Sequence, residues 1–491
     1  MLAALVILPF FAAALAFFIY NPKIRRALLP LTSIIEFAAA LLCRKQGSTA
    51  LWNILALDDL GFLVLTLTCL LFFVISLYAV DYLAYEGEYG VHKRNRLHFT
   101  NVPEAVFTAC MLLFLGSAVL VTLACHLGLL WVAIEGTTIA CAPLIYFHRT
   151  PQSLEATWKY IIICSVGIAF ALLGNFLLDV AWQTKDTPPI PMTLSDMLRT
   201  ASGVNAPWFK AAYIFIFIGY GVKMGLAPMH TWLPDAHSEA PSPVSALLSG
   251  ALLNCAFLGV LRLHQLSLAA GFGSFSQELF VLFGLLSMLT ATLFIVGQAD
   301  FKRMLAYSSV EHMGILLLGV GIGGLAAHGG MLQLVCHSLT KGALFLLAGN
   351  ILRVYHVKII SQISGLGKVL PWSGALWLAG FLAVAGSPPF GIFASEFMIL
   401  RAMLQKGFGL VPLLYLLCLG AIFVGMGLAC LRMFLGTIPA DLPAPNVGTE
   451  KERLLFVLPP FILLLLCAAL SLYQPEWLKD ILSAAALHLI T

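Results

Sequence analysis

The stretch FIFIGYGVKMGLAPMHTWLPDAHSEAPSPVSALLSG, residues 215–250, decides the fold. It begins as an apolar run that holds a single charge, Lys223, and glycine, proline and a polar segment then interrupt it. A charge at mid-bilayer costs several kcal/mol, so such a residue usually faces the interior of a helix bundle and marks an ion or proton path. Non-helical backbone at that depth is tolerated only inside protein or beside water. We therefore expect a broken membrane helix with a functional lysine.

The rest of the chain has the composition of a membrane protein. Of its 491 residues, 60% are hydrophobic and only 10% are charged. Apolar stretches matching the ~30 Å hydrocarbon core recur about fourteen times. They are 2–20, 28–42, 60–80, 105–124, 127–147, 159–181, 208–227, 244–264, 278–297, 304–323, 330–352, 372–400, 410–434 and 455–473. We predict an all-α polytopic membrane protein. Because the second stretch is short, the number of membrane helices could be thirteen instead of fourteen.

Charge predicts orientation but no nucleic-acid partner. The net charge of +4 is small and spread out. With the N-terminus outside, the inner loops carry more Lys and Arg than the outer ones, and both termini then lie outside. The first apolar run, residues 2–20, lacks a basic leader and a small-residue cleavage site, so we interpret it as a retained helix.

A second interruption resembles the first. Residues 386–391, GSPPFG, break an apolar run, and Glu396 follows closely. Paired Gly/Pro-interrupted helices at corresponding places in two halves indicate an inverted-repeat transporter and its binding site. The alternative is a pair of ordinary proline kinks.

Three more ionisable side chains lie in apolar stretches: Glu135, His337 and Lys341. His337 and Lys341 are four residues apart and share a helix face, so they could form a proton relay. A lysine neutralised by a structural carboxylate is the alternative. Glu135 and Lys223 could meet between helices, each stabilising the charge of the other, either as a coupling device or as a static ion pair.

Several polar residues allow two interpretations. Asn254 could bond a water chain or a neighbouring helix. The cluster after the first break has no usual zinc spacing, which leaves roles in pathway entry or loop ordering. Glu311 and His312 are either interfacial or on the pathway, and the group 300–303 reads as an interfacial anchor. The cluster consists of His230, Asp235, His237 and Glu239.

The cysteines do not predict a redox centre. Eleven are scattered through apolar segments and none forms C-x-x-C, whereas iron–sulfur ligands come in close sets. We expect no catalytic residue, no metal and no cofactor in this chain.

Four segments resemble the proton-translocating, antiporter-like subunits of respiratory complex I and the Mrp antiporters. They are GVKMGLAPMHTWLPDAHSEAPSPVSALLSG (221–250), DFKRMLAYSSVEHMG (300–314), CHSLTKGALFLLAGNI (336–351) and SPPFGIFASEFMIL (387–400). Within that family, LEATWKYIIICSVGIAFALLGNFLL (154–178) and SSVEHMG (308–314) look most like membrane subunits of complex I-related nickel–iron hydrogenases, of the hydrogenase-4 or formate hydrogenlyase type.

The resemblance implies a fold and a set of site residues. The fold has two inverted five-helix repeats, so that the chain divides into 1–104, 105–270, 271–435 and 436–491. Glu135, Lys223, Lys341 with His337, and Glu396 match the family's pathway residues. Asn254 stands where the family usually has lysine or histidine, and an amide cannot carry a proton. Water or His230 must then bridge that position.

The resemblance also implies a function. The chain would move protons, or sodium ions, in response to electron transfer in partner subunits, most simply in a hydrogenase-type complex. Its partners would be neighbouring antiporter-like subunits, a soluble iron–sulfur/nickel–iron arm and the lipids of a bacterial or archaeal cytoplasmic membrane. The alternatives are a subunit of NADH–quinone oxidoreductase, a free-standing cation/proton antiporter, and a scaffold whose buried charges are static.

Overall fold

The computed structural model describes residues 1–491 except 47–50, 52–53, 94–100, 184–190, 438–451 and 490–491. The described residues form helices and isolated β-bridges but no β-strand. Apolar stretches become helices because lipid offers no partner for backbone N–H and C=O groups, and a helix pairs them within the segment. The predicted all-α fold is confirmed.

The helices follow one another with short connections. In the first half they are α1 (Leu2–Phe18), α2 (Pro22–Gln46), α3 (Asp59–Lys93), α4 (Glu104–Leu123), α5 (Leu127–Ile145), η1 (Tyr146–His148), α6 (Pro151–Trp182), α7 (Leu194–Arg199), α8 (Ala206–Met224), α9 (Trp232–Glu239), α10 (Ser242–Leu247), η2 (Leu248–Leu252) and α11 (Leu253–Ala269). In the second half they are α12 (Gly273–Ile295), α13 (Phe301–Ile322), α14 (Leu325–Tyr355), η3 (Ile360–Gln362), α15 (Leu366–Val369), α16 (Pro371–Val384), α17 (Gly391–Lys406), α18 (Val411–Phe434), α19 (Leu454–Leu472) and α20 (Glu476–Leu487).

Eleven of the described helices are long and apolar enough to cross a membrane. Three further crossings bring the number to the predicted fourteen. They are the short helix α1 and the two interrupted crossings, α8/α9 and α16/α17. The second helix is not short, because α2 extends beyond the apolar run 28–42 at both ends.

Both predicted breaks are present. α8 ends at Gly225 and α16 is followed by Gly386, and both glycines have positive φ, which other residues rarely adopt. The expected single run 372–400 is therefore two helices, α16 and α17. Each broken crossing is the fourth of five consecutive crossings, α4 to α11 and α12 to α18. Because five is odd, the second set starts from the opposite side of the membrane, as an inverted repeat does. The domain boundaries 1–104, 105–270, 271–435 and 436–491 stay a prediction.

Two short helices lie where the sequence predicted none. The segment 182–207, between two of the predicted crossings, holds α7, whose Leu194 and Met197 are buried. α20 follows the last crossing and packs against α3 and α14.

Small residues bring α6 and α8 into close contact. A Cβ atom on Gly219 would lie 2.5 Å from the carbonyl oxygen of Gly167, and one on Gly174 would lie 2.9 Å from that of Ala212. Membrane helices use small residues in this way, because backbone packing replaces the hydrophobic force that lipid does not provide. The contact fixes the last turn of α8, and therefore Lys223, against α6.

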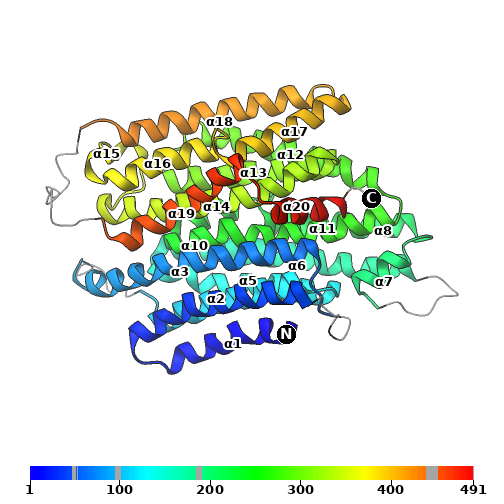
Figure 1. The fold of residues 1–491 in the computed structure, drawn as a ribbon, viewed down its shortest axis with the longest axis horizontal. Helices are drawn as coiled ribbons and strands as arrows, with labels where there is room; N and C mark the ends of the chain where they lie inside the picture. The colour runs from blue at the N-terminus through cyan, green and yellow to red at the C-terminus, as the bar shows by residue number, and fades with distance from the viewer. Residues whose placement is uncertain (47–50, 52–53, 94–100, 184–190, 438–451, 490–491) are drawn as a thin grey trace.

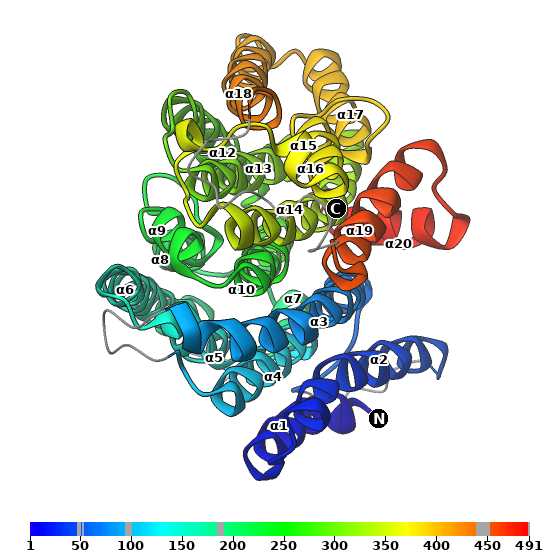
Figure 2. The same ribbon diagram turned by 90° about the vertical axis from the view of Figure 1, so that its left-hand side faces the viewer.

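The two repeats meet around α14. In Figure 2, α14 lies in the middle of the bundle, and it packs against α10, α13, α16, α17 and α19. α1 and α2 lie at one edge (Figures 1 and 2). The most apolar parts of α11, α13 and α14 are buried throughout, whereas only 33% of those of α12 and α18 is buried. The interior of the bundle is therefore where a polar path is shielded from lipid.

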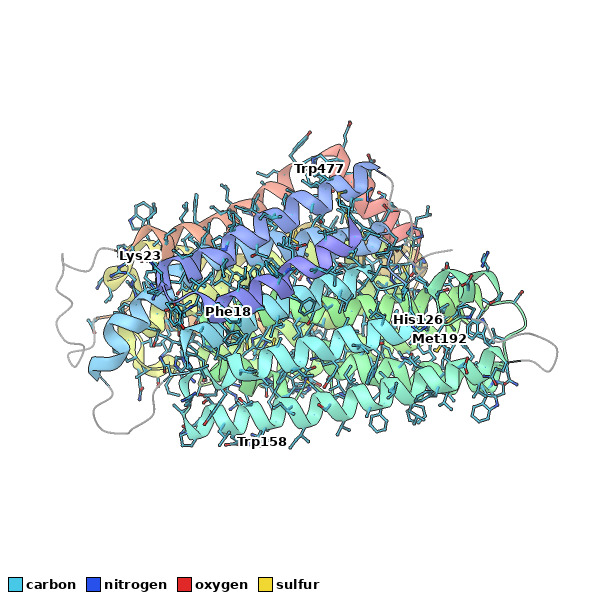
Figure 3. All side chains as sticks on the ribbon, turned by 90° about the horizontal axis from the view of Figure 1, so that it is seen from below. Phe18, Lys23, His126, Trp158, Met192 and Trp477 are labelled. Carbon is cyan, nitrogen blue, oxygen red and sulfur yellow. The ribbon has the colours of Figure 1, made fainter. Side chains whose placement is uncertain are left out.

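The two ends of the bundle are distinguishable. Figure 3 shows Lys23 at one end, and His126 and Met192 side by side at the other. The backbone N–H of Leu127 donates to the carbonyl of Met192, which ties the segment before α7 to the start of α5. Between the ends, apolar side chains such as Trp158, which is 56% exposed, point outward (Figure 3). Both chain ends lie toward the end that carries α7 (Figure 1).

Reporter fusions test this topology. We expect a fusion at residue 95, which lies outside the described residues, to report the inside of the cell. A fusion at residue 195, in α7, should report the outside, because α3 and α7 end at opposite ends of the bundle and the basic loops stay inside. At each position, the measurements are the enzymatic activity of an alkaline phosphatase fusion and the fluorescence of a green fluorescent protein fusion. Finding both positions on one side would contradict the number of crossings between them.

Candidate functional site

Lys223 is held by hydroxyl groups in the first repeat. It lies in the last turn of α8 and is fully buried. Its Nζ donates to Thr138 Oγ1 at 2.7 Å and to Tyr160 Oη at 3.3 Å. Among the described residues Lys223 has no ion pair with a carboxylate. A buried ammonium group usually has such a partner, so its absence marks this lysine as a candidate for proton exchange.

Glu135 and Lys223 are connected through Thr138 rather than directly. Thr138 donates to Glu135 Oε2 at 2.9 Å and accepts from Lys223. Ser165 of α6 donates to the other carboxylate oxygen at 3.2 Å. Glu135 is only partly buried, at the outer edge between α5 and α6. The two charges therefore communicate across one hydroxyl, which can pass a proton as well as separate the pair.

This asymmetry gives a prediction for single and double variants. Glu135→Gln leaves the fully buried Lys223 without its nearest negative charge, a loss of about 3 kcal/mol for a desolvated partner. Lys223→Met costs less, because Glu135 is partly exposed. The double variant should therefore assemble better than Glu135→Gln alone. The amount of intact complex on native gels is the measurement, and losses that simply add would show that the two residues are independent.

Lys341 is the central charge of the second repeat. It is fully buried in α14, four residues after His337. Its Nζ donates to the carbonyl of Leu305 at 2.8 Å and to the hydroxyl of Ser308, both on α13. No described carboxylate forms an ion pair with it. Glu311, one turn beyond Ser308, is the acidic group whose charge acts on Lys341.

A chain of imidazole, amide and hydroxyl groups leads from Lys341 toward Glu396. The rings of His337 and His312 lie 5.0 Å apart, and His312 Nδ1 is 2.8 Å from Gln333 Nε2. Ser395, the neighbour of Glu396, donates to Gln333 Oε1. All of these side chains are buried. No pattern in the sequence singled out Gln333, because polar side chains such as glutamine also hydrogen-bond between ordinary membrane helices.

Two acidic residues lie at the far end of this series of polar side chains. Glu311 is 2% exposed and Glu396 is 6% exposed, so both lie in the interior. Glu311 Oε2 and Glu396 Oε1 have no hydrogen-bond partner among the described residues. Glu311 and His312 both lie inside the bundle rather than on its outer surface, and their place on the pathway stays a prediction.

Asn254 joins the repeats. Its Nδ2 donates to Ser338 Oγ of α14 and to the carbonyl of Gly250, each at 2.7 Å. Ser338 follows His337 directly in sequence. Asn254 therefore bonds to the neighbouring helix beside His337, as one of the two interpretations expects.

The cluster after the first break separates into three environments. Asp235 forms ion pairs with Lys159 at 2.9 Å and Arg303 at 3.1 Å, which are contacts that the loop-ordering interpretation expects. His230 packs against the rings of Phe294 and Tyr307, and no hydrogen bond to Asn254 is found among the described residues.

The other two members of the cluster lie closer to the second repeat. His237 is fully buried and stacks on Phe345 of α14 at 4.8 Å. Glu239 pairs with Lys358 at 2.8 Å. Within the described part of the chain, no group of three or more His, Cys, Asp or Glu side chains is placed to hold a metal ion.

Residues 124–423 match the family model described as NADH:quinone oxidoreductase/Mrp antiporter, transmembrane. The chain is 36% identical to a hydrogenase-4 component F homolog of Methylacidiphilum infernorum, over 97% of this chain and 98% of the relative. It is 31% identical to NAD(P)H-quinone oxidoreductase chain 4 1 of Synechococcus elongatus, over 76% of this chain and 69% of the relative.

The fold has a close counterpart among solved structures. A chain of the Mrp complex from Dietzia sp. superposes with a TM-score of 0.84 at 20% identity, covering 99% of this chain and 97% of that chain. At that identity the likeness shows the fold alone. The family model covers both broken helices, and the hydrogenase-4 relative spans nearly the whole length. The protein is an antiporter-like membrane subunit that belongs to the NADH:quinone oxidoreductase/Mrp antiporter transmembrane family.

Proposed function

We propose that this chain carries protons across the membrane through the buried residues of both repeats, driven by electron transfer in partner subunits of a hydrogenase-type complex. The observation that carries the proposal is the pair of fully buried lysines, Lys223 and Lys341, whose ammonium groups bond only to neutral oxygens of the described residues. Desolvation disfavours a charged lysine, so such a group can exchange its proton when a nearby charge moves.

In the first repeat, the proton would move between Glu135 and Lys223 through Thr138. The negative charge of Glu135 stabilises the protonated amine of Lys223 across that hydroxyl. A rearrangement that separates the two lowers this stabilisation, and Lys223 then releases its proton. The break at Gly225, directly after the last turn of α8, provides a place where such a rearrangement can occur.

In the second repeat, the proton would pass from Lys341 by way of His337, His312 and Gln333 toward Glu396. Imidazole accepts and donates protons near neutral pH, and the amide and hydroxyl groups orient the neighbouring donors. Asn254 between the repeats cannot ionise. Transfer across it therefore needs water, or the two repeats exchange charge by electrostatic coupling alone.

The redox chemistry would lie in partner subunits. The 36% identity to a hydrogenase-4 component F homolog over almost the full length favours a hydrogenase-type complex with neighbouring antiporter-like subunits and a soluble iron–sulfur/nickel–iron arm. We propose that this chain binds no electron carrier of its own, because its cysteines are scattered rather than paired in close motifs. We also propose a cytoplasmic-membrane location with both termini outside, which follows from the bias of the basic loops.

Purification and ion transport test this proposal together. A tagged chain should co-purify with nickel–iron and iron–sulfur subunits, and inside-out vesicles should acidify when the redox substrates are added. Acidification should persist without sodium ions. Purification with NADH-oxidising subunits would instead favour a NADH–quinone oxidoreductase. Sodium-for-proton exchange with no redox partner would identify a free-standing antiporter and overturn the proposal.

A further inference from the structure

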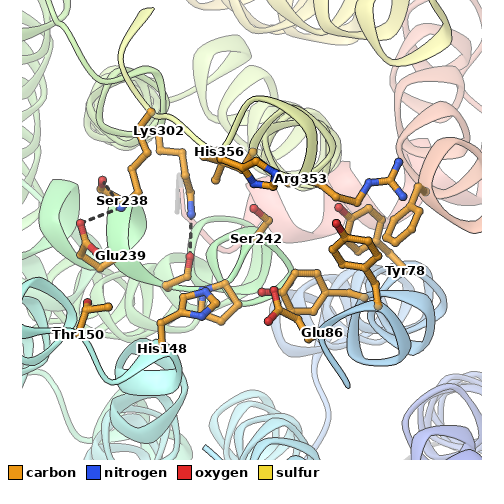
Figure 4. A pocket seen from close by; sticks show the side chains of 18 residues that line it. Tyr78, Glu86, His148, Thr150, Ser238, Glu239, Ser242, Lys302, Arg353 and His356 are labelled. Atoms are coloured by element: carbon orange, nitrogen blue, oxygen red, sulfur yellow. Dashed lines mark hydrogen bonds and ion pairs between the residues drawn. The ribbon is translucent and has the colours of Figure 1, made fainter. Parts of the chain in front are cut away.

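A cavity of about 390 Å³ opens at the end of the bundle opposite α7. Its walls come from the end of α3, the segment after α9, the start of α13 and the end of α14, so both repeats contribute to it (Figure 4). Polar side chains around it include Glu86, Glu239, Lys302, Arg353 and Lys358. By the basic-loop bias this is the inner side of the membrane.

Lys302 forms the buried part of this cavity. Although it lies in the first turn of α13 and was expected as an interfacial anchor, Lys302 is only 1% exposed. Its Nζ donates to the carbonyl of Ala240 at 2.7 Å, and Figure 4 shows it extending into the cavity. The ion pair between Lys358 and Glu239, at 2.8 Å, lies beside Lys302 (Figure 4). Lys302 has no ion pair among the described residues.

The next charge inward is close. Lys341 bonds to the carbonyl of Leu305, which is three residues after Lys302 on the same helix, or about 4.5 Å of helical rise. His237 is fully buried, and its ring stacks at 4.8 Å on Phe345, which lies one helical turn after Lys341 on α14. Ser238, the next residue in sequence, lines the cavity, so His237 lies between the cavity and the part of α14 that carries Lys341.

Polar contacts from the second repeat fix the geometry of the cavity wall. Ser238 donates to Asp300 Oδ2 at 2.7 Å, and Asp300 also accepts from the backbone N–H groups that begin α13. Together with the bonds from Lys302 to Ala240 and from Lys358 to Glu239, these contacts hold three consecutive residues after His237 against α13 and its neighbour loop. Such fixed positions are needed if protons are to pass between side chains that do not move far.

We propose that Lys302 is a proton-carrying residue and that the cavity above it is the inner port of the pathway, entering at the seam between the repeats and leading by His237 to Lys341. The inference rests on the proposed function, since a port has meaning only if protons move through Lys341. At Lys302 a proton enters from water in the cavity, binds the neutral amine, and leaves from the ammonium group to His237. No other bond is made or broken.

Substitution of Lys302 tests the residue. Lys302→Met removes the proton-binding group, and Lys302→Arg keeps the charge and a donor for Ala240 but does not deprotonate. Both should lower redox-driven proton translocation by about a hundredfold, the scale at which positioned acid–base groups act. If Lys302 had only a structural role, Lys302→Arg would translocate protons normally. Lys368→Met, at an exposed lysine of the same end, is the matched control and should translocate normally.

Blocking the cavity tests the port in an assembled complex. Lys358→Cys places a thiol in the cavity wall, where the Lys358 side chain is 31% exposed. A bulky maleimide added from the inner side should stop translocation in this variant, and leave translocation in Lys368→Cys and in the unsubstituted protein unchanged. Unlabelled Lys358→Cys should translocate, and comparing it with the labelled protein separates a blocked cavity from the loss of the ion pair with Glu239.

The outcomes separate the two proposals. If Lys341→Ala abolishes translocation while Lys302→Arg and the labelled Lys358→Cys translocate normally, protons enter elsewhere and the port is overturned. If Lys341→Ala itself translocates normally, the proposed function fails, and the port fails with it. Loss in Lys302→Arg together with a block by the maleimide supports the port.

Discussion

Replacing Lys341 by alanine should lower redox-driven proton translocation by about a hundredfold while the complex still assembles. Lys341 is fully buried and its Nζ bonds only to Leu305 O and the Ser308 hydroxyl, so removing it breaks no ion pair among the described residues. Its proton-carrying role is lost, and the neighbouring His337 lacks a donor. The measurement is dye-reported acidification of inside-out vesicles, normalised to the amount of complex.

Arginine at this position separates charge from proton transfer. Lys341→Arg retains a positive charge but a guanidinium does not deprotonate in proteins, so it should fail as alanine does. Lys368→Arg, at an exposed lysine, is the matched control. Normal translocation in Lys341→Arg would refute a protonation role. In a tightly coupled complex, electron transfer should slow in parallel with translocation.

Replacing Glu396 by glutamine should block translocation to a similar extent without unfolding the protein. Glutamine keeps the shape of the side chain but cannot bind a proton. Glu396 lies in α17 soon after the second break, and its Oε1 has no partner among the described residues. We predict that Glu396 is the hand-off point to a neighbouring subunit or to the outer side. The readout is again vesicle acidification, beside a thermal-stability measurement on the purified complex.

Lysine at position 396 should be tolerated better than glutamine. A lysine also carries a proton, and the nearby Glu311 provides it with an opposite charge. Translocation at the original rate in the glutamine variant would mean that Glu396 only ends a helix. Failure of lysine together with glutamine would show that a negative charge, rather than an exchangeable proton, is needed there.

The sequence predicted the helices, both breaks and the burial of the principal charges, because each depends on local composition. A run of apolar residues identifies a crossing, and Gly225 and Gly386 lie where the backbone needs positive φ. The burial of Lys223 and Lys341 follows from their position in such runs. These features need no knowledge of which helices are neighbours.

The connections between the charges were not predictable in the same way. Thr138 and Gln333 are ordinary residues of membrane helices, and their roles depend on helices that are far apart in sequence. Lys302 looked interfacial because Asp300 and Arg303 flank it at a helix start. It is buried because the segment after α9 covers it, a contact between repeats that periodicity does not reveal. Glu36 of α2, fully buried in the peripheral part, was missed for the same reason.

The amide of Asn254 has a consequence for a complex at rest. Because Asn254 bonds Ser338 and cannot ionise, a proton held near Lys223 has no titratable stepping stone toward Lys341 at that junction. A membrane that already carries a voltage would otherwise drive ions backward through any unbroken conductor. If protons move by way of Lys223 and Lys341 as proposed, and no water bridges Asn254, this junction would act as an electrical insulator and would keep the gradient from discharging when electron transfer stops.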